Sequence, residues 1–168
     1  NITVKDNVID CYGTPAGSYG ERNAVSINYA GYRVATGGVD NITFTGNTVN
    51  AGTYPTMFRS GISVDEGEGT FSGNTLKAIS ADILVRFAAS GNVTVSGNYA
   101  NGGGMEFADF NAGTGTLSIT GNFFDGTFAN TYSNALRLKN NYTARTTVVS
   151  GNTFTGFAGN VAGYGGTL

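Results

Sequence analysis

Residues 92–98 read Asn-Val-Thr-Val-Ser-Gly-Asn, and close variants of this phrase recur at 1–7, 41–47, 69–74, 116–122 and 146–152. Within the phrase, apolar residues alternate with Thr or Ser, which is the period of two of a strand with one buried face. The closing pair is Gly-Asn in every copy except the first, where it is Asp-Asn. These residues tolerate the left-handed backbone of a sharp turn. Each copy therefore predicts a strand that ends in a tight turn.

The repeat predicts an all-β fold, a single-domain parallel β-solenoid (parallel β-helix) over residues 1–168. The base period is near 24 residues, and longer intervals hold insertions. A second alternating strand follows each copy, so each of about six coils has at least two strands, before a glycine-rich tail at 157–168. Helical spacing of apolar residues is absent. Stacked coils would align the closing asparagines as a ladder: Asn7, Asn47, Asn74, Asn98, Asn122 and Asn152.

The composition excludes several classes of partner and site. A formal net charge of -2 and a pI of about 4.9 predict no binding to nucleic acid or to an anionic membrane. The chain has no histidine, which removes His-based acid/base catalysis, Ser-His-Asp triads and His-containing zinc sites. No apolar run is long enough for a membrane span. We predict no cofactor and no metal ion, and we expect Cys11 to be a buried apolar residue.

The apolar-Thr-apolar-Ser/Thr-Gly-Asn phrase resembles the parallel β-helix repeats of pectate-lyase-like polysaccharide lyases, alginate epimerases, bacteriophage tailspikes and bacterial surface proteins. The resemblance covers residues 1 to about 156. It implies a right-handed coil and an extracellular, cell-surface or virion location. In this superfamily, active sites and sugar-binding grooves lie on outward positions of stacked strands and on adjacent loops. The fold alone selects no activity.

The second strand of each coil carries charged residues at its expected outward positions. If its apolar residues point inward, adjacent coils place Asp65 near Arg86 and Glu106 near Arg137. One interpretation is a charged groove in which basic groups neutralise a uronate or act as a base. The other is a ladder of exposed ion pairs. Under the first interpretation, the candidate catalytic residues are Asp82, Glu106, Arg137 and Lys139.

Two further carboxylate arrangements are candidates for chemistry. Asp65, Glu66 and Glu68 form a dense acidic cluster that we predict to lie on a loop. A glycoside hydrolase needs two carboxylates about 5 to 10 Å apart. Asp82 with Glu106, or Glu106 with Asp109, are the candidate pairs. Stray pairs of carboxylates on a solvated face are the alternative interpretation.

Aromatic side chains are a third candidate feature, because their faces bind sugar rings. Several of the nine tyrosines fall in the predicted insertions, and the largest insertion, within 10–40, is the preferred binding loop. Alternatively, these tyrosines cover the edge of the core while their hydroxyls stay in water. Together with Asp65 and Arg86, the glycan-binding candidates are Tyr12, Tyr19, Tyr29 and Tyr32.

The outward residues of the first strand form a Thr/Ser array that runs from Thr43 to Thr120. This array resembles the Thr-x-Thr ladders of solenoid ice-binding proteins and departs from them at Lys5 and Val148. Threonine also suits exposed strands in general.

The leading hypothesis is a non-catalytic β-helix of a cell or virion surface that presents loops to glycans or partner subunits, as a tailspike or adhesin does. Because solenoid ends must be covered and Asn1 opens inside a repeat, we expect a homo-oligomer, a larger assembly or a piece of a longer chain. The first alternative is a polysaccharide lyase, epimerase or glycoside hydrolase. The second is an ice-binding solenoid.

Overall fold

The structure is a computed structural model that describes residues 1–10, 23–28, 39–50, 60–65, 67–79, 83–86, 92–102, 105–108, 115–126, 134–139 and 146–163. Within these ranges the regular structure is β-strand, and no helix is present. The predicted all-β class is therefore confirmed.

Consecutive strands visit three parallel six-stranded sheets in turn, which is a solenoid-like order. Sheet A contains β1 (Ile2–Lys5), β4 (Val39–Thr45), β7 (Gly67–Ser72), β10 (Val93–Ser96), β13 (Thr116–Thr120) and β16 (Thr146–Ser150). Sheet B contains β2 (Val8–Asp10), β5 (Thr48–Asn50), β8 (Thr75–Ile79), β11 (Tyr99–Gly102), β14 (Phe123–Asp125) and β17 (Thr153–Thr155). Sheet C contains β3 (Asn23–Asn28), β6 (Ser60–Asp65), β9 (Ile83–Arg86), β12 (Met105–Ala108), β15 (Asn134–Lys139) and β18 (Gly159–Gly163).

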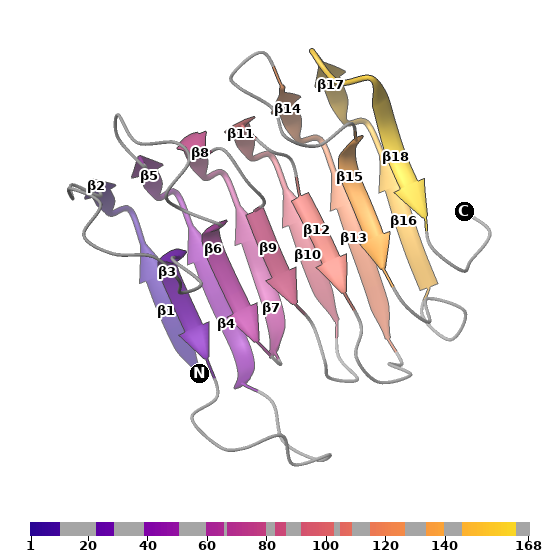
Figure 1. Cartoon of the computed structure of the whole chain (residues 1–168). Coiled ribbons are helices and arrows are strands. Elements are labelled where there is room, and N and C mark those ends of the chain that lie inside the picture. Colours follow the sequence, from indigo (N-terminus) through magenta and orange to yellow (C-terminus); the bar gives the residue numbers. More distant parts are fainter. Residues whose placement is uncertain are drawn as a thin grey trace, which may run out of the picture.

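Sheets A and C form two layers, and the short strands of sheet B run along the upper edge of the view in Figure 1. Each repeat thus supplies three strands, where the sequence indicated at least two. The additional strand is the segment directly after each anchor asparagine.

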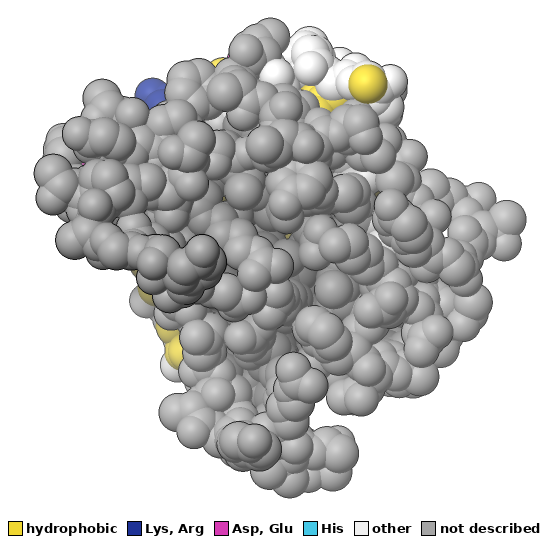
Figure 2. Space-filling view, viewed as in Figure 1, with side chains coloured by type: hydrophobic (Ala, Val, Ile, Leu, Met, Phe, Trp, Pro, Cys, Tyr) yellow, Lys and Arg dark blue, Asp and Glu magenta, His cyan; other side chains and the backbone are white. Residues whose placement is uncertain are grey.

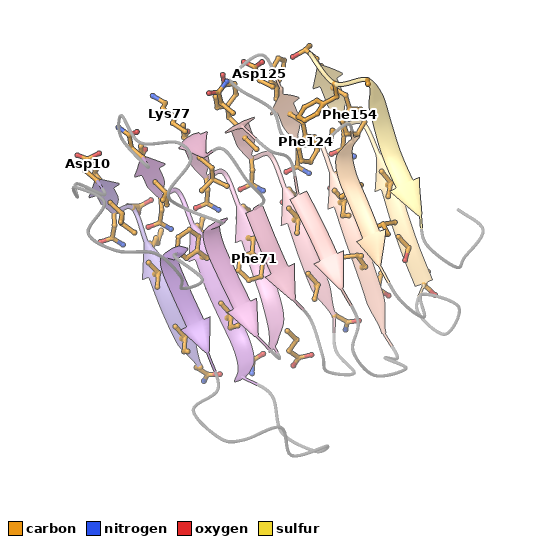
Figure 3. The ribbon with its side chains drawn as sticks, in the orientation of Figure 1. Asp10, Phe71, Lys77, Phe124, Asp125 and Phe154 are labelled. Atoms are coloured by element: carbon orange, nitrogen blue, oxygen red, sulfur yellow. The ribbon has the colours of Figure 1, made fainter. Side chains whose placement is uncertain are left out.

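The core lies inside the three sheets because the period of two turns every second side chain inward. In β13, for example, Leu117 and Ile119 are buried while their neighbours are partly exposed. Aromatic rings stack between neighbouring strands, and Figure 3 shows Phe124 beside Phe154, whose ring centroids are 5.1 Å apart. The buried apolar residues are Ile42, Phe44, Val49, Phe71, Leu76, Val93, Val95, Ala100, Leu117, Ile119, Phe124, Ala135, Leu136 and Leu138.

The anchor asparagines form a hydrogen-bonded ladder at the turn from sheet A to sheet B. From Asn7 to Asn122, each side-chain amide donates to Oδ1 of the next anchor at 2.9 to 3.2 Å. The same Oδ1 accepts the backbone N–H of the preceding anchor at 2.9 to 3.0 Å. Because buried polar groups need partners, this ladder allows Asn47, Asn74, Asn98 and Asn122 to be no more than 3% exposed.

Asp65 and Glu68 of the acidic cluster lie in strands, so the prediction of a loop was wrong for these two residues, and Glu66 lies outside the described residues. Asp65 is the last residue of β6 and Glu68 lies within β7, so only residue 66 separates the two strands. The chain passes almost directly from sheet C to sheet A here. In the backbone register Asp65 lies opposite Arg86, and the side chain of Glu68 accepts, through Oε2, the backbone N–H of Asn92 at 3.2 Å.

Part of the predicted glycine-rich tail is also strand. Gly159–Gly163 forms β18 and pairs in parallel with β15. Phe157, just before it, packs against the core. The backbone of β15 needs hydrogen-bond partners, and β18 supplies them despite its small side chains.

Candidate functional site

The backbone register of sheet C brings the predicted charged pairs opposite one another. Asp65 pairs with Arg86, and Glu106 pairs with Arg137. Lys139 lies opposite Ala108 in the same pair of strands. Leu136 and Leu138, on either side of Arg137, are 0% and 2% exposed. The charged groove itself stays a prediction.

The other predicted site residues lie outside the described part of the chain. They are Asp82, Tyr12, Tyr19, Tyr29 and Tyr32. The binding loop within 10–40 and the carboxylate pairs that involve Asp82 or Asp109 therefore stay predictions.

Sheet B presents two rows of side chains on its outward face. The middle residue of each short strand faces the core, so the first and third residues point away from it. The first row, in register, is Val8, Thr48, Thr75, Tyr99, Phe123 and Thr153. The third residues form a polar row of Asp10, Asn50, Lys77, Asn101, Asp125 and Thr155.

Tyr99 and Phe123 form an aromatic pair in the first row. Their ring centroids are 5.6 Å apart and the ring planes are inclined by 20°. Phe123 is 39% exposed, and Tyr99 is partly exposed. Threonines occupy the same position in the flanking strands, so the pair stands between shorter side chains. The sequence reasoning missed this pair, although aligning the six copies on their asparagines places both rings in adjacent copies of one column.

Asp125 connects the aromatic pair to the polar row. Its Oδ2 accepts a hydrogen bond from the Tyr99 hydroxyl at 3.0 Å and another from the Asn101 side-chain amide at 3.0 Å. Tyr99 and Asn101 lie on β11 and Asp125 lies on β14, so the two bonds join neighbouring strands of sheet B. A carboxylate that accepts two such bonds holds both donors in place.

The protonation state of Tyr99 follows from this contact. Partial burial raises the pKa of its phenol above the usual value, and the hydrogen bond to Asp125 and the charge of that carboxylate raise it further. A hydrogen bond with Asn101 acts in the opposite direction. At physiological pH Tyr99 is therefore a neutral O–H donor.

Charged side chains lie at intervals along the polar row. Figure 3 shows Asp10, Lys77 and Asp125 along one outward edge of the molecule, and Lys77 is exposed. In Figure 2 a small dark-blue area and some yellow atoms reach the surface along the upper edge of the view. The described residues contain one ion pair, between Lys5 and Asp6 at 3.8 Å, so the Lys77 ammonium has no carboxylate partner among them. Polar groups beside an aromatic pair can bind the hydroxyls of a ligand whose ring packs on the aromatics.

Sheet A carries a different outward surface, made of hydroxyl groups. Two in-register rows run through β4, β7, β10 and β13, namely Thr43, Thr70, Thr94 and Ser118, and Thr45, Ser72, Ser96 and Thr120. The hydroxyls of Thr45 and Ser72 lie 3.2 Å apart. The rows of hydroxyl groups are interrupted at Lys5 in β1, opposite Thr45, and at Val148 in β16, opposite Ser118.

No family model, curated protein or solved structure matches the chain. Among the described residues, no helix is long and apolar enough to cross a bilayer. The same part of the chain holds no group of three or more Cys, Asp or Glu residues positioned to bind a metal ion.

Proposed function

We propose that this chain is a non-catalytic, glycan-binding β-helix of a cell or virion surface. The observation that carries the proposal is the aromatic pair Tyr99–Phe123 beside the polar row of sheet B. Sugar rings have an apolar C–H face and a rim of hydroxyls, so a site for them combines an aromatic surface with fixed polar groups. Sheet B places both on rigid, stacked strands.

The architecture that we propose is a right-handed parallel β-helix of six coils. The regular cycle of strands through three sheets and the asparagine ladder along the axis support it. A saccharide chain lying along the axis would meet one pair of outward residues at every coil, about every 4.8 Å. The proposal also includes contact between these outward faces and partner subunits of a homo-oligomer or larger assembly.

A glycan array tests the binding proposal. Wild type is compared with the double variant Tyr99→Ala/Phe123→Ala and with Val148→Ala, which truncates an exposed apolar residue on sheet A. We expect wild type and Val148→Ala to bind the same glycans, and the double variant to lose about tenfold or more in affinity because its stacking surface is gone. Circular dichroism establishes that all three are folded. Equal binding by the double variant, or no binding by wild type, would contradict the proposal.

The enzymatic alternative rests on the opposite-charge pairs of sheet C, Asp65 with Arg86 and Glu106 with Arg137. It is separated from binding by an ultraviolet assay for unsaturated products on uronate-containing polysaccharides. The proposal of a non-catalytic protein expects no product. Product that wild type forms and Arg137→Ala does not would identify a polysaccharide lyase. That result would reject the proposal that the protein is non-catalytic.

A second candidate function, ice binding, is favoured by the register of the hydroxyl rows on sheet A. Eight hydroxyl-bearing residues repeat at the strand spacing over four adjacent strands, which is a regular template for ordered water. Thermal hysteresis is measured for wild type, for Thr70→Lys/Thr94→Lys and for Thr75→Lys on sheet B. Hysteresis lost in the double variant alone supports this candidate, and its absence in wild type rejects it.

A further inference from the structure

Two contacts hold the side chain of Tyr99 in place. Phe123, on β14, stacks against one face of its ring with the centroids 5.6 Å apart. Asp125, also on β14, accepts the hydrogen bond of its hydroxyl at 3.0 Å. Both contacts come from the same neighbouring strand, so the ring is fixed from one direction.

The other face of the Tyr99 ring is turned toward β8, because β8 and β14 lie on opposite sides of β11 in sheet B. The residue opposite Tyr99 in β8 is Thr75, whose side chain is too short to cover an aromatic ring. Lys77, opposite Asn101, is exposed at the border of this space. One face of a fixed ring therefore lies above a small residue and beside hydrogen-bond donors.

We propose that this face of Tyr99 is a subsite for a single pyranose ring, and that Asp125 is its positioning residue. The inference rests on the proposed glycan-binding function and adds which face binds and what holds it. The pyranose packs its C–H face on Tyr99 above Thr75, with its hydroxyls within reach of Lys77 and Asn101. Asp125 acts through the Tyr99 hydroxyl, since its Oδ2 is occupied by Tyr99 and Asn101.

The expected effect follows from preorganisation. A ring that is already fixed loses less rotamer freedom when a ligand packs on it, and one immobilised side chain corresponds to about a threefold to tenfold change in affinity. Asp125→Asn keeps the size of the side chain but replaces the charge-assisted bond by a weaker neutral one. Tyr99→Phe keeps the ring and removes the bond. Each change should therefore weaken binding by a similar factor.

A double-mutant cycle tests the inference by titration calorimetry. The ligands are cellohexaose, chitohexaose, mannohexaose and hexagalacturonate. The proteins are wild type, Tyr99→Phe, Asp125→Asn and the double variant of the two, with Tyr99→Ala to remove the ring. Asp6→Asn is the matched control, because Asp6 is exposed in the turn before β2 and lies outside both outward rows of sheet B. Asn101→Ala reports on the second group that Asp125 holds.

We expect Asp125→Asn and Tyr99→Phe each to weaken binding about threefold to tenfold, and their combination to weaken it no further. Asp6→Asn should bind as wild type does. Additive losses of affinity from the two changes would overturn the positioning role of Asp125. The role would also be overturned if Asn101→Ala weakened binding as much as Asp125→Asn does while Tyr99→Phe had no effect. If Tyr99→Ala abolishes binding while Asp125→Asn and Tyr99→Phe have no effect, the proposed function stands and this inference fails. If Tyr99→Ala binds as wild type, or no ligand binds wild type, both fail.

Discussion

At the residue scale, the buried asparagines are the strongest link between sequence and structure. Asn98 is 3% exposed, yet its side chain makes four hydrogen bonds. Its Oδ1 accepts the backbone N–H and the side-chain amide of Asn74, and its own amide donates to Asn122 Oδ1 and to the carbonyl of Phe71. A glycine or serine could form the same turn, but neither could make these bonds along the axis.

We expect Asn98→Ala to lower the free energy of unfolding by about 2 to 4 kcal/mol, because buried groups of both neighbouring repeats lose the side chain that they bind. Asn7→Ala is the control. Because Asn7 is exposed, this change should lower the free energy of unfolding by less than about 1 kcal/mol. Urea denaturation followed by circular dichroism measures both. Similar losses in the two variants would show that the buried part of the ladder contributes no more than its exposed end.

Partial burial of the Tyr99 phenol, together with its hydrogen bond to Asp125, makes the free energy of unfolding depend on pH in the alkaline range. The pKa of Tyr99 is raised in the folded protein above its ordinary value of 10.0. The stabilisation is therefore fully present below the unfolded pKa and is lost as the pH rises through the folded pKa. We expect wild type to be more stable than Tyr99→Phe at neutral pH and to lose that advantage above pH 10. Urea denaturation of both proteins at each pH gives the difference, and a constant difference would contradict this account.

The aromatic pair could have been found from the sequence, whereas its contacts could not. Alignment of the repeats on their asparagines places Tyr99 and Phe123 in one column, between threonines. The tyrosines of the insertions were the more obvious candidates, because loops usually carry function. The bond from Tyr99 to Asp125 depends on which residue of the next strand lies opposite, and the spacing of the repeats alone does not define that register.

At the element scale, two positions in sheet A and its turns require glycine for different structural reasons. Gly97, at the turn between β10 and β11, has a φ of 61°, and a Cβ there would meet nothing within 4 Å. Asp6 occupies the same turn position in the first repeat with a φ of 55°. Gly69 lies within β7, where a Cβ would overlap the main-chain carbonyl of Ile42.

We therefore expect Gly97→Ala to lower the free energy of unfolding by about 1 to 2 kcal/mol, because alanine disfavours the left-handed backbone at this position. Gly69→Ala should cost about 3 kcal/mol or more, because a backbone atom of β4 would have to move. Thermal denaturation of the two variants shows which of them loses more stability. A smaller loss for Gly69→Ala than for Gly97→Ala would show that β4 and β7 are less closely packed than described.

The long alternating strands could be predicted, but the strands of sheet B could not. In sheet A, at least two inward residues per strand show the period of two, as Val93 and Val95 do. Most strands of sheet B have three residues and one inward side chain, such as Val49 in β5. A single apolar residue has no period, so the sequence showed only that the chain returns to the core.

At the scale of the whole molecule, the repeat predicted parallel stacking because identical turns must lie above one another for their amides to bond. It could not predict that sheet B would carry an aromatic pair and a polar row on a face of its own. Sheets A, B and C thus present a hydroxyl surface, an aromatic and polar surface, and in-register charged residues. The central claim is that the surface of sheet B binds the glycan.

Chemical-shift mapping tests that claim most directly. Isotope-labelled protein is titrated with a saccharide that the glycan array identifies, and backbone amide shifts are followed by NMR. We predict that the largest shifts fall on β8, β11 and β14, at Thr75, Tyr99 and Phe123. Shifts confined to β9, β12 and β15 of sheet C, around Arg86, Glu106 and Arg137, would contradict the account and place the glycan in the charged groove.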